Sequence, residues 1–144
     1  MPAAPNELSW NDAMIADFRA HDGRITEGRL AGANLLLMTS IGAKTGQPRT
    51  IPLGYSRDGD RYVVVGSNSG FPTQPQWLTN IAADPIVKVE VGTEVFHATA
   101  TVSHDEERQR LWQIHVAAIP YFATYENMTE RQLPVVSLER LPAD

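Results

Sequence analysis

Two cations stand close together between two apolar stretches of the chain. Residues 42–49 have the sequence Gly-Ala-Lys-Thr-Gly-Gln-Pro-Arg, so Lys44 and Arg49 share a short segment with two glycines and the hydroxyl of Thr45. Backbone N–H groups and cationic side chains in such a segment can bind an anion. Because the formal net charge of the chain is −5, a local cationic site favours one specific anionic ligand over a polyanion. The alternative is a solvated hairpin tip with ordinary surface charges.

The surroundings of the Lys44-Thr45 pair do not fit a nucleotide-binding P-loop. That motif has glycine directly before the lysine and a helix after it. Here Ala43 precedes Lys44, and an apolar, β-leaning segment follows Pro48. Residues 42–49, called the cation turn below, are therefore predicted to join two strands.

Two later segments can contribute to the same site. The loop over 66–70 has the sequence Gly-Ser-Asn-Ser-Gly, whose small residues let a ligand approach the backbone and supply neutral donors. Trp77 and Asn80 lie three residues apart in a predicted short helix and share one of its faces. The indole could cover an aromatic ligand while the amide hydrogen-bonds its edge. A plain connection and a tryptophan packed in the core are the structural alternatives.

An aromatic group follows near the C-terminus. Tyr121 and Tyr125 are four residues apart, with Phe122 between them. At helical spacing the two phenols could line a pocket or donate a proton. The same spacing also fits a helix stripe that faces the core.

The sequence disfavours metal-dependent and hydrolytic chemistry. It contains no cysteine, which removes thiolate ligands and a cysteine nucleophile. Its four histidines, at positions 21, 97, 104 and 115, lack the spacing of a metal site and are expected to be ordinary surface or core residues. No G-x-S-x-G nucleophile elbow is present.

Composition bounds the class of protein. With 144 residues, 42% of them hydrophobic, the chain is expected to form one globular domain. Its acidic balance argues against nucleic acid as a partner. We expect a cytoplasmic protein, because the N-terminus lacks the features of a signal peptide and no apolar run approaches the roughly 20 residues of a membrane helix. Peripheral membrane contact through Trp10, Met14 and Phe18 stays open beside core packing of the same residues. The sequence carries no signal for the oligomeric state.

Hydrophobic periodicity predicts the elements that must position these groups. A first helix is expected over 9–21, a short one over 75–83, an amphipathic one over 105–118 and a further helical piece up to about 129. Strands are expected over 34–40, 48–56, 61–67, 86–91, 95–103 and 134–140, with hairpin turns at 58–60 and 92–93. This order indicates an α+β domain built on a small barrel or a strongly curved sheet. In a simple meander the cation turn and the 66–70 loop would lie at opposite ends, so they become neighbours only through further curvature or crossing. A barrel whose third strand, over 61–67, crosses to pair elsewhere would join them.

Taken together, these motifs resemble the deazaflavin-dependent nitroreductase family, actinobacterial oxidoreductases that use coenzyme F420. The resemblance runs from about residue 34 to residue 138, and its carriers are the segments 35–39, 42–49, 52–53, 58–60, 75–77, 80, 83–85, 107–108, 111–112, 129–131 and 134–136. It implies an α+β fold of the split β-barrel type (FMN-binding split-barrel-like), mainly antiparallel with flanking helices. Residues 1–144 would form a single split-barrel domain, with an N-terminal helix and connection over 1–33 and a barrel core over 34–140.

The resemblance also implies a cofactor site. Lys44 and Arg49 would bind the phosphate of F420, with Ala43 and Thr45 in the same loop. The strand after the turn would run along the deazaflavin ring, two further segments would close the site, and one aromatic side chain would face the ring. The residues along the ring are Thr50, Ile51, Pro52, Leu53 and Gly54. The two closing segments are Val65, Gly66, Ser67 and Asn68, and Gln76, Trp77, Leu78, Thr79 and Asn80. The side chain that faces the ring is Phe122.

The implied activity is transfer of a hydride from reduced F420 to a quinone, an enone or a nitro compound. Tyr125, and with it Tyr121, is the predicted proton donor in the acceptor pocket. An FMN-binding oxidoreductase of the same fold, with FMN less favoured than F420, and a non-catalytic F420 carrier are the alternatives. Ile119 and Phe122 stand where the nitroimidazole-reducing member carries tyrosines, which predicts weak or no activity on bulky nitroimidazoles.

Overall fold

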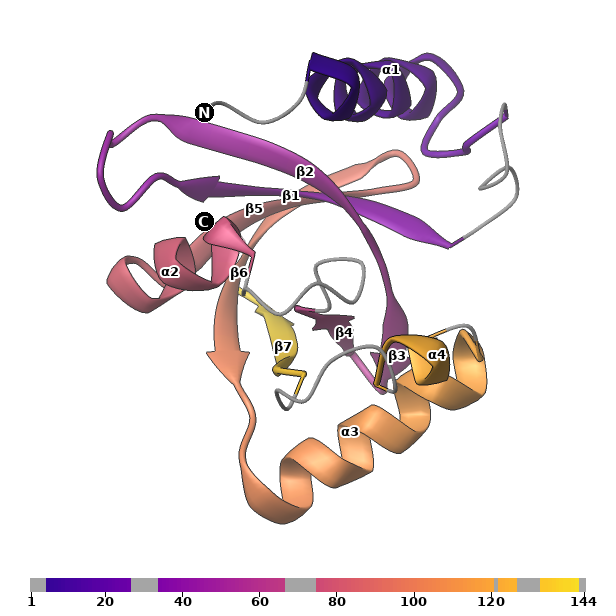
Figure 1. Cartoon of the computed structure of the whole chain (residues 1–144), viewed down its shortest axis with the longest axis vertical. Helices are drawn as coiled ribbons and strands as arrows, with labels where there is room; N and C mark the ends of the chain where they lie inside the picture. The colour runs from indigo at the N-terminus through magenta and orange to yellow at the C-terminus, as the bar shows by residue number, and fades with distance from the viewer. Residues whose placement is uncertain (1–4, 27–33, 67–74, 121, 127–132, 143–144) are drawn as a thin grey trace.

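Seven strands form one sheet in the computed structural model, which describes residues 5–26, 34–66, 75–120, 122–126 and 133–142 (Figure 1). The strands are β1 (Leu35–Ile41), β2 (Pro48–Gly54), β3 (Ser56–Asp58), β4 (Arg61–Val65), β5 (Ile86–Val91), β6 (Glu94–Val102) and β7 (Val135–Arg140). Their order is β2-β1-β5-β6-β7-β4-β3, and neighbours pair antiparallel throughout. The predicted hairpin turns at 58–60 and 92–93 are confirmed between β3 and β4 and between β5 and β6.

The prediction of one continuous strand over 48–56 is wrong. The chain leaves β2 at Gly54, passes Tyr55 and enters β3 at Ser56, and these two strands lie at opposite ends of the sheet order. A single residue therefore links the two ends, so the sheet has to curl into a half-barrel, as β2 does where it sweeps across the molecule toward β3 in Figure 1. The predicted strand over 61–67, β4 in the structure, accordingly pairs with β3 and β7 and not with β2, which is the crossing that the sequence argument invoked. The curled antiparallel sheet with flanking helices agrees with the predicted split-barrel fold.

Four helices cover the described part of the sheet. They are α1 (Pro5–Ala20), α2 (Gln76–Ala83), α3 (Asp105–Ala118) and α4 (Phe122–Glu126). The first begins four residues before its predicted start, the next two follow the predictions closely, and the part of the last prediction beyond Glu126 lies outside the described residues. Within the described part of the chain, no helix combines the length and the apolar character that crossing a membrane requires.

The buried residues divide between the two faces of β1. Leu36 and Met38 belong to the main core, which also contains Trp77 of α2. Leu35 and Leu37 point to the other face and pack against α1, whose Met14 and Phe18 are 7% and 2% exposed. This alternation explains why β1 is apolar at every position from 35 to 38. Core packing is thus the observed role of Met14 and Phe18, whereas the side chain of Trp10 lies outside the described residues.

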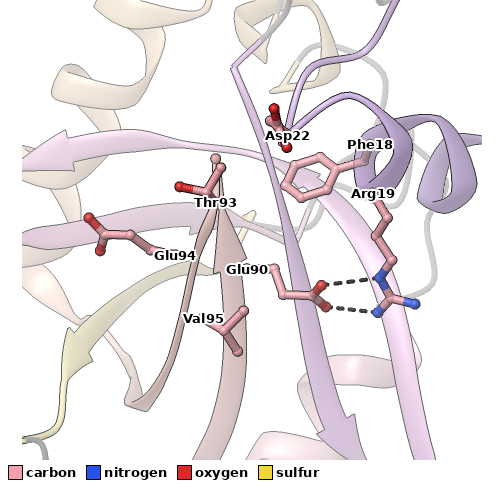
Figure 2. Close-up of a pocket in the computed structure, with 9 residues that line it drawn as sticks. Phe18, Arg19, Asp22, Glu90, Thr93, Glu94 and Val95 are labelled. Carbon is pink, nitrogen blue, oxygen red and sulfur yellow. Dashed lines mark hydrogen bonds and ion pairs between the residues drawn. The ribbon is translucent and has the colours of Figure 1, made fainter.

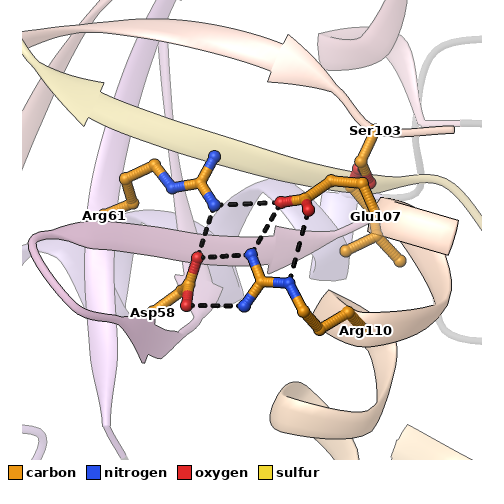
Figure 3. Close-up of polar contacts among 6 residues, drawn as sticks. Asp58, Arg61, Ser103, Glu107 and Arg110 are labelled. Carbon is orange, nitrogen blue, oxygen red and sulfur yellow. Dashed lines mark hydrogen bonds and ion pairs between the residues drawn. The ribbon is translucent and has the colours of Figure 1, made fainter.

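A four-membered ion-pair network fastens α3 to the β3–β4 turn (Figure 3). Arg110 contacts Asp58 at 2.9 Å and Glu107 at 2.8 Å, and Arg61 contacts Glu107 at 2.9 Å and also pairs with Asp58. The guanidinium groups of Arg110 and Arg61 hold the pKa of Asp58 well below its usual range. Asp58 and Glu107 were among the residues that carried the family resemblance, and the structure gives them this structural role.

Candidate functional site

The cation turn is closed by its own hydrogen bonds. Gly42 N–H donates to the Gln47 carbonyl at 2.8 Å, Gly46 N–H donates to the Gly42 carbonyl at 2.8 Å, and Gln47 N–H donates to Thr45 Oγ1 at 3.2 Å. Gly46 has a φ of +70°, which side-chain-bearing residues rarely adopt. The hydroxyl of Thr45 therefore stabilises the turn, and Lys44 extends from the tip into solvent.

Lys44 and Arg49 have no acidic partner among the described residues, unlike four arginines of the surface. Arg19, Arg61, Arg110 and Arg140 each pair with a carboxylate at 2.9 Å or less. Both site cations are exposed. Because an unpaired cation keeps its full capacity for charge-assisted hydrogen bonds, these two side chains are available to an anionic ligand.

Asn80 joins the turn to helix α2. Its Oδ1 accepts hydrogen bonds from Ala43 N–H at 3.0 Å and from Gln76 Nε2 at 3.4 Å, and its Nδ2 donates to Ser40 Oγ at 3.3 Å. The side chain is 1% exposed. Since the Ala43 amide can only donate, the contact fixes which end of the Asn80 side chain faces the turn. The helix predicted over 75–83 is confirmed as α2, and the structure places it beside the cation turn.

Helix α2 also reaches the end of β4, so the cation turn and the end of β4 meet the same helix. A Cβ added at Gly66 would lie 2.7 Å from Leu78 Cδ1, which shows how closely the β4 end approaches α2. Val65 is 3% exposed. Ser67 and Asn68, which the resemblance placed in the cofactor site, lie outside the described residues.

The residues of α2 that were predicted to bind the cofactor fall on two sides of the helix. Trp77 and Leu78 are 6% and 7% exposed and pack in the main core, so the structural alternative for the tryptophan is the one observed. Gln76 and Thr79 are exposed. Any contact of α2 with a ligand is therefore expected from its polar, exposed side and not from the indole ring.

Strand β2 supplies an open backbone edge. It lies at the end of the sheet, where its described pairing partner is β1 alone. The N–H and C=O groups on the outer edge of such a strand are available to a ligand. Thr50, Ile51, Pro52, Leu53 and Gly54 are all half-buried, and the hydroxyls of Thr50 and Thr39 lie 2.7 Å apart. The predicted run of ligand-facing backbone thus coincides with an edge strand.

Gly54, at the end of β2, faces α4 and the end of α3. A Cβ placed there would lie 3.4 Å from Ile119 Cδ1 and 3.6 Å from Phe122 Cε2. A Cβ at this position would thus be in van der Waals contact with two apolar side chains. Tyr125 lies in α4, but its side chain is outside the described part of the chain, as is the whole of Tyr121. Their predicted roles stay predictions.

The ring of the buried His115 packs against the ring of Phe122. The rings of His115 and Phe122 lie 4.5 Å apart at an interplanar angle of 79°. His115 is fully buried, and its Nδ1 lies 2.8 Å from Ser56 Oγ. Burial lowers the pKa of His115 to about 4, so the ring is neutral at pH 7. The signal for this position was its place on the apolar stripe of α3, three and four residues after Trp112 and Leu111.

A hollow elsewhere on the surface contains none of the predicted site residues. It lies between the end of α1 and the β5–β6 turn and is lined by Phe18, Arg19, Asp22, Gly23, Glu90, Gly92, Thr93, Glu94 and Val95 (Figure 2). Arg19 there donates to both carboxylate oxygens of Glu90, at 3.1 and 2.8 Å. Its charge is therefore already compensated, in contrast to Lys44 and Arg49.

Comparison with known proteins gives consistent matches. The model of the F420H(2)-dependent quinone reductase family matches residues 11–140. An F420H(2)-dependent quinone reductase of Mycobacterium tuberculosis (strain H37Rv) is 44% identical over 137 residues, which cover 92% of this chain and 89% of the relative. The solved F420-H2 dependent reductase FDR-A is 36% identical with a TM-score of 0.69, covering 74% of this chain and 94% of its own. A structure described as a domain-swapped dimer is 32% identical with a TM-score of 0.70, covering 94% of this chain and 100% of its own. The match to FDR-A confirms the predicted split-barrel fold.

Proposed function

The chain belongs to the F420H(2)-dependent quinone reductase family, and from this membership we propose that it transfers a hydride from reduced coenzyme F420 to a quinone. The observation that carries the proposal for this chain is the pair of exposed cations, Lys44 and Arg49, without acidic partners among the described residues. In a protein with a net charge of −5, such a pair suits one anionic group. In this family the cofactor is F420, and its phosphate is the anionic group that we assign to this pair.

The remaining described residues fit the cofactor as well. The outer edge of β2 offers backbone groups to the polar rim of a flat ring. At its end, Gly54 lies beside the apolar side chains of Ile119 and Phe122. Charged and polar groups at the turn and an apolar corner at the other end of the strand correspond to a ligand with a phosphate tail and an aromatic head.

Bound reduced F420 supplies the hydride, from C5 of its deazaflavin ring. Lys44 and Arg49 would neutralise the phosphate and fix the tail, and the β2 backbone would set the position of the ring along the strand. Phe122 and Ile119 would form an apolar wall that has no proton to give. A quinone that accepts one hydride and one proton becomes the hydroquinone, so the pocket must also provide a proton.

The buried histidine is a poor source of this proton. His115 is close to the corner, but burial keeps it neutral and its Nδ1 already contacts Ser56. We therefore keep Tyr125, with Tyr121 as its neighbour at helical spacing, or a water molecule as the proton donor. A Tyr125→Phe variant that retained full turnover and an unchanged pH profile would leave water as the donor.

Contact with a membrane would be useful to an enzyme that reduces lipid-soluble quinones. The apolar face of α1 does not offer it at Met14 and Phe18, which are buried against the sheet. A comparison of turnover with a short-chain and a long-chain quinone, each with and without lipid vesicles, tests for contact through another surface. Vesicle-dependent activity on the long-chain quinone alone would support it.

Two alternatives, an FMN-binding oxidoreductase and a non-catalytic F420 carrier, are tested by titrating the protein with each cofactor at equal salt. Titration with F420 and with FMN should give tighter binding of F420, because the chain belongs to the F420H(2)-dependent family. Tight binding of F420 without oxidation of its reduced form by any quinone would indicate a carrier. Tighter binding of FMN would overturn the proposal.

A further inference from the structure

Asn80 hydrogen-bonds to a residue on each side of the proposed phosphate site, to the backbone of Ala43 and to the side-chain hydroxyl of Ser40. Its Oδ1 accepts from the N–H of Ala43, the residue directly before Lys44. Its Nδ2 donates to Ser40, and Ser40 is the cross-strand partner of Arg49 in the β1–β2 ladder. One side chain is thus linked to the neighbour of each site cation.

We propose that Asn80 is a positioning residue that sets the distance between Lys44 and Arg49, and that it acts without being a ligand of the cofactor itself. The inference rests on the proposed function, because it assumes that these two cations bind the phosphate of F420. It departs from the resemblance, which implied a direct contact between Asn80 and the cofactor.

The burial of the amide supports a role inside the protein. Asn80 and Ser40 are each 1% exposed. Both donor and acceptor atoms of the Asn80 side chain have protein partners, at 3.0, 3.3 and 3.4 Å. Buried polar groups that are fully paired hold one arrangement, because each alternative leaves a donor or an acceptor without a partner.

The hydrogen bond between Ala43 and Asn80 attaches the cation turn to helix α2. The hydrogen bonds of residues 42, 45, 46 and 47 remain within the turn. Within the described residues, the Ala43–Asn80 bond is the one that connects the turn to an element outside its own hairpin. Without it, the hairpin tip would keep its internal shape but could swing relative to α2, and Lys44 would move with it.

Two forms of the cofactor make a selective test. Full-length F420 carries the phosphate, whereas a truncated deazaflavin that ends before the phosphate does not. Asn80→Ala should weaken binding of F420 by on the order of 10-fold and leave the truncated form within about 2-fold of wild type. Equal weakening of both forms would mean that Asn80 supports the whole fold or touches the ring, and would overturn the proposal.

A second readout separates positioning from direct contact. Amide hydrogen exchange is measured on the cofactor-free protein, in which no ligand contact exists. Asn80→Ala should raise exchange at Ala43 by about 10-fold or more, since the N–H loses its acceptor. Unchanged exchange at Ala43 together with weaker F420 binding would show that Asn80 is a cofactor ligand.

Ser40→Ala is the second variant, and it tests the positioning role of Asn80 if Asn80→Ala does not fold. It removes the link toward Arg49 and keeps the Ala43 bond. F420 binding should weaken by about 2- to 5-fold with the truncated form unaffected. Unchanged F420 binding would contradict the coupling to Arg49.

The cation variants keep this inference separate from the proposed function. If Lys44→Ala and Arg49→Ala bind F420 as wild type does, the phosphate site itself is wrong. If both weaken F420 binding and Asn80→Ala does not, only the positioning role is wrong.

Discussion

Lys44 and Arg49 are the residues on which the cofactor assignment depends most. Each is exposed and lacks an acidic partner among the described residues. Lys44→Ala and Arg49→Ala should each raise the Kd for F420 by on the order of 10-fold, the range of one lost charge-assisted hydrogen bond. Binding is measured by fluorescence titration at fixed salt.

Lys88→Ala is the matched control for these two variants. Lys88 is an exposed lysine on β5 with no acidic partner among the described residues, and its removal changes the net charge by the same amount. An equal loss of affinity in Lys88→Ala would mean that only the overall charge matters.

His115 makes the stability of the protein depend on pH. In the folded state burial lowers its pKa to about 4, whereas the unfolded chain takes up the proton near 6.5. Below pH 6.5 the unfolded state therefore binds more protons, and stability falls as the pH falls. This group alone should cost about 2 kcal/mol between pH 7 and pH 5.

Urea denaturation at the two pH values measures the effect, with His115→Asn as the reference. Asparagine can keep a hydrogen bond to Ser56 but does not titrate. The pH-dependent difference between the two proteins isolates His115 from the exposed histidines. Equal pH dependence in both would show that the ring is accessible to protons in the folded state.

At the scale of elements, α1 is a packed part of the fold. Phe18 is 2% exposed between α1 and the β1 residues Leu35 and Leu37. Phe18→Ala should lower the free energy of unfolding by about 3 kcal/mol, as expected for a large cavity in a core. Asp12→Ala, an exposed change on the same helix, should have little effect. Equal effects would mean that α1 is not docked in solution.

The ion-pair network between α3 and the β3–β4 turn should contribute a salt-sensitive part of the stability. Arg110 bridges Asp58 and Glu107, whereas Arg140 pairs singly with Glu94. Arg110→Met should lower Tm more than Arg140→Met at low salt, and the difference should shrink at high salt. Thermal unfolding at two salt concentrations checks both statements. A difference that persists at high salt would point to packing instead of charge.

Local signals predicted the elements well, and non-local contacts account for what they missed. The turns at 58–60 and 92–93 and the bounds of β5 and α3 follow from nearby residues. The division of 48–56 into β2 and β3 does not, because it depends on which strands meet when the sheet curls. Likewise, the spacing of Trp77 and Asn80 predicted that both would lie near a ligand. In the structure the indole packs in the main core, and the amide hydrogen-bonds to the cation turn.

For the whole molecule, curling of the sheet is what assembles the site. The cation turn and the end of β4 are separated in the chain, yet both meet α2. The same curl takes the chain from Gly54, at the apolar corner with Phe122, into β3 at Ser56, which contacts His115. In the proposed site, the phosphate tail, the ring and the acceptor would thus receive contacts from different parts of one curled sheet and its helices.

Single-turnover oxidation of bound reduced F420 tests the central claim most directly. The reduced cofactor is loaded on the protein and mixed with a quinone, an enone and a nitroimidazole in a stopped-flow instrument. Oxidation by the quinone should saturate with its concentration and exceed the protein-free rate by at least about 100-fold, since the protein holds donor and acceptor together. The nitroimidazole should react weakly or not at all, since Phe122 and Ile119 provide no hydroxyl. Oxidation by the quinone no faster than in protein-free solution would contradict the proposed reductase.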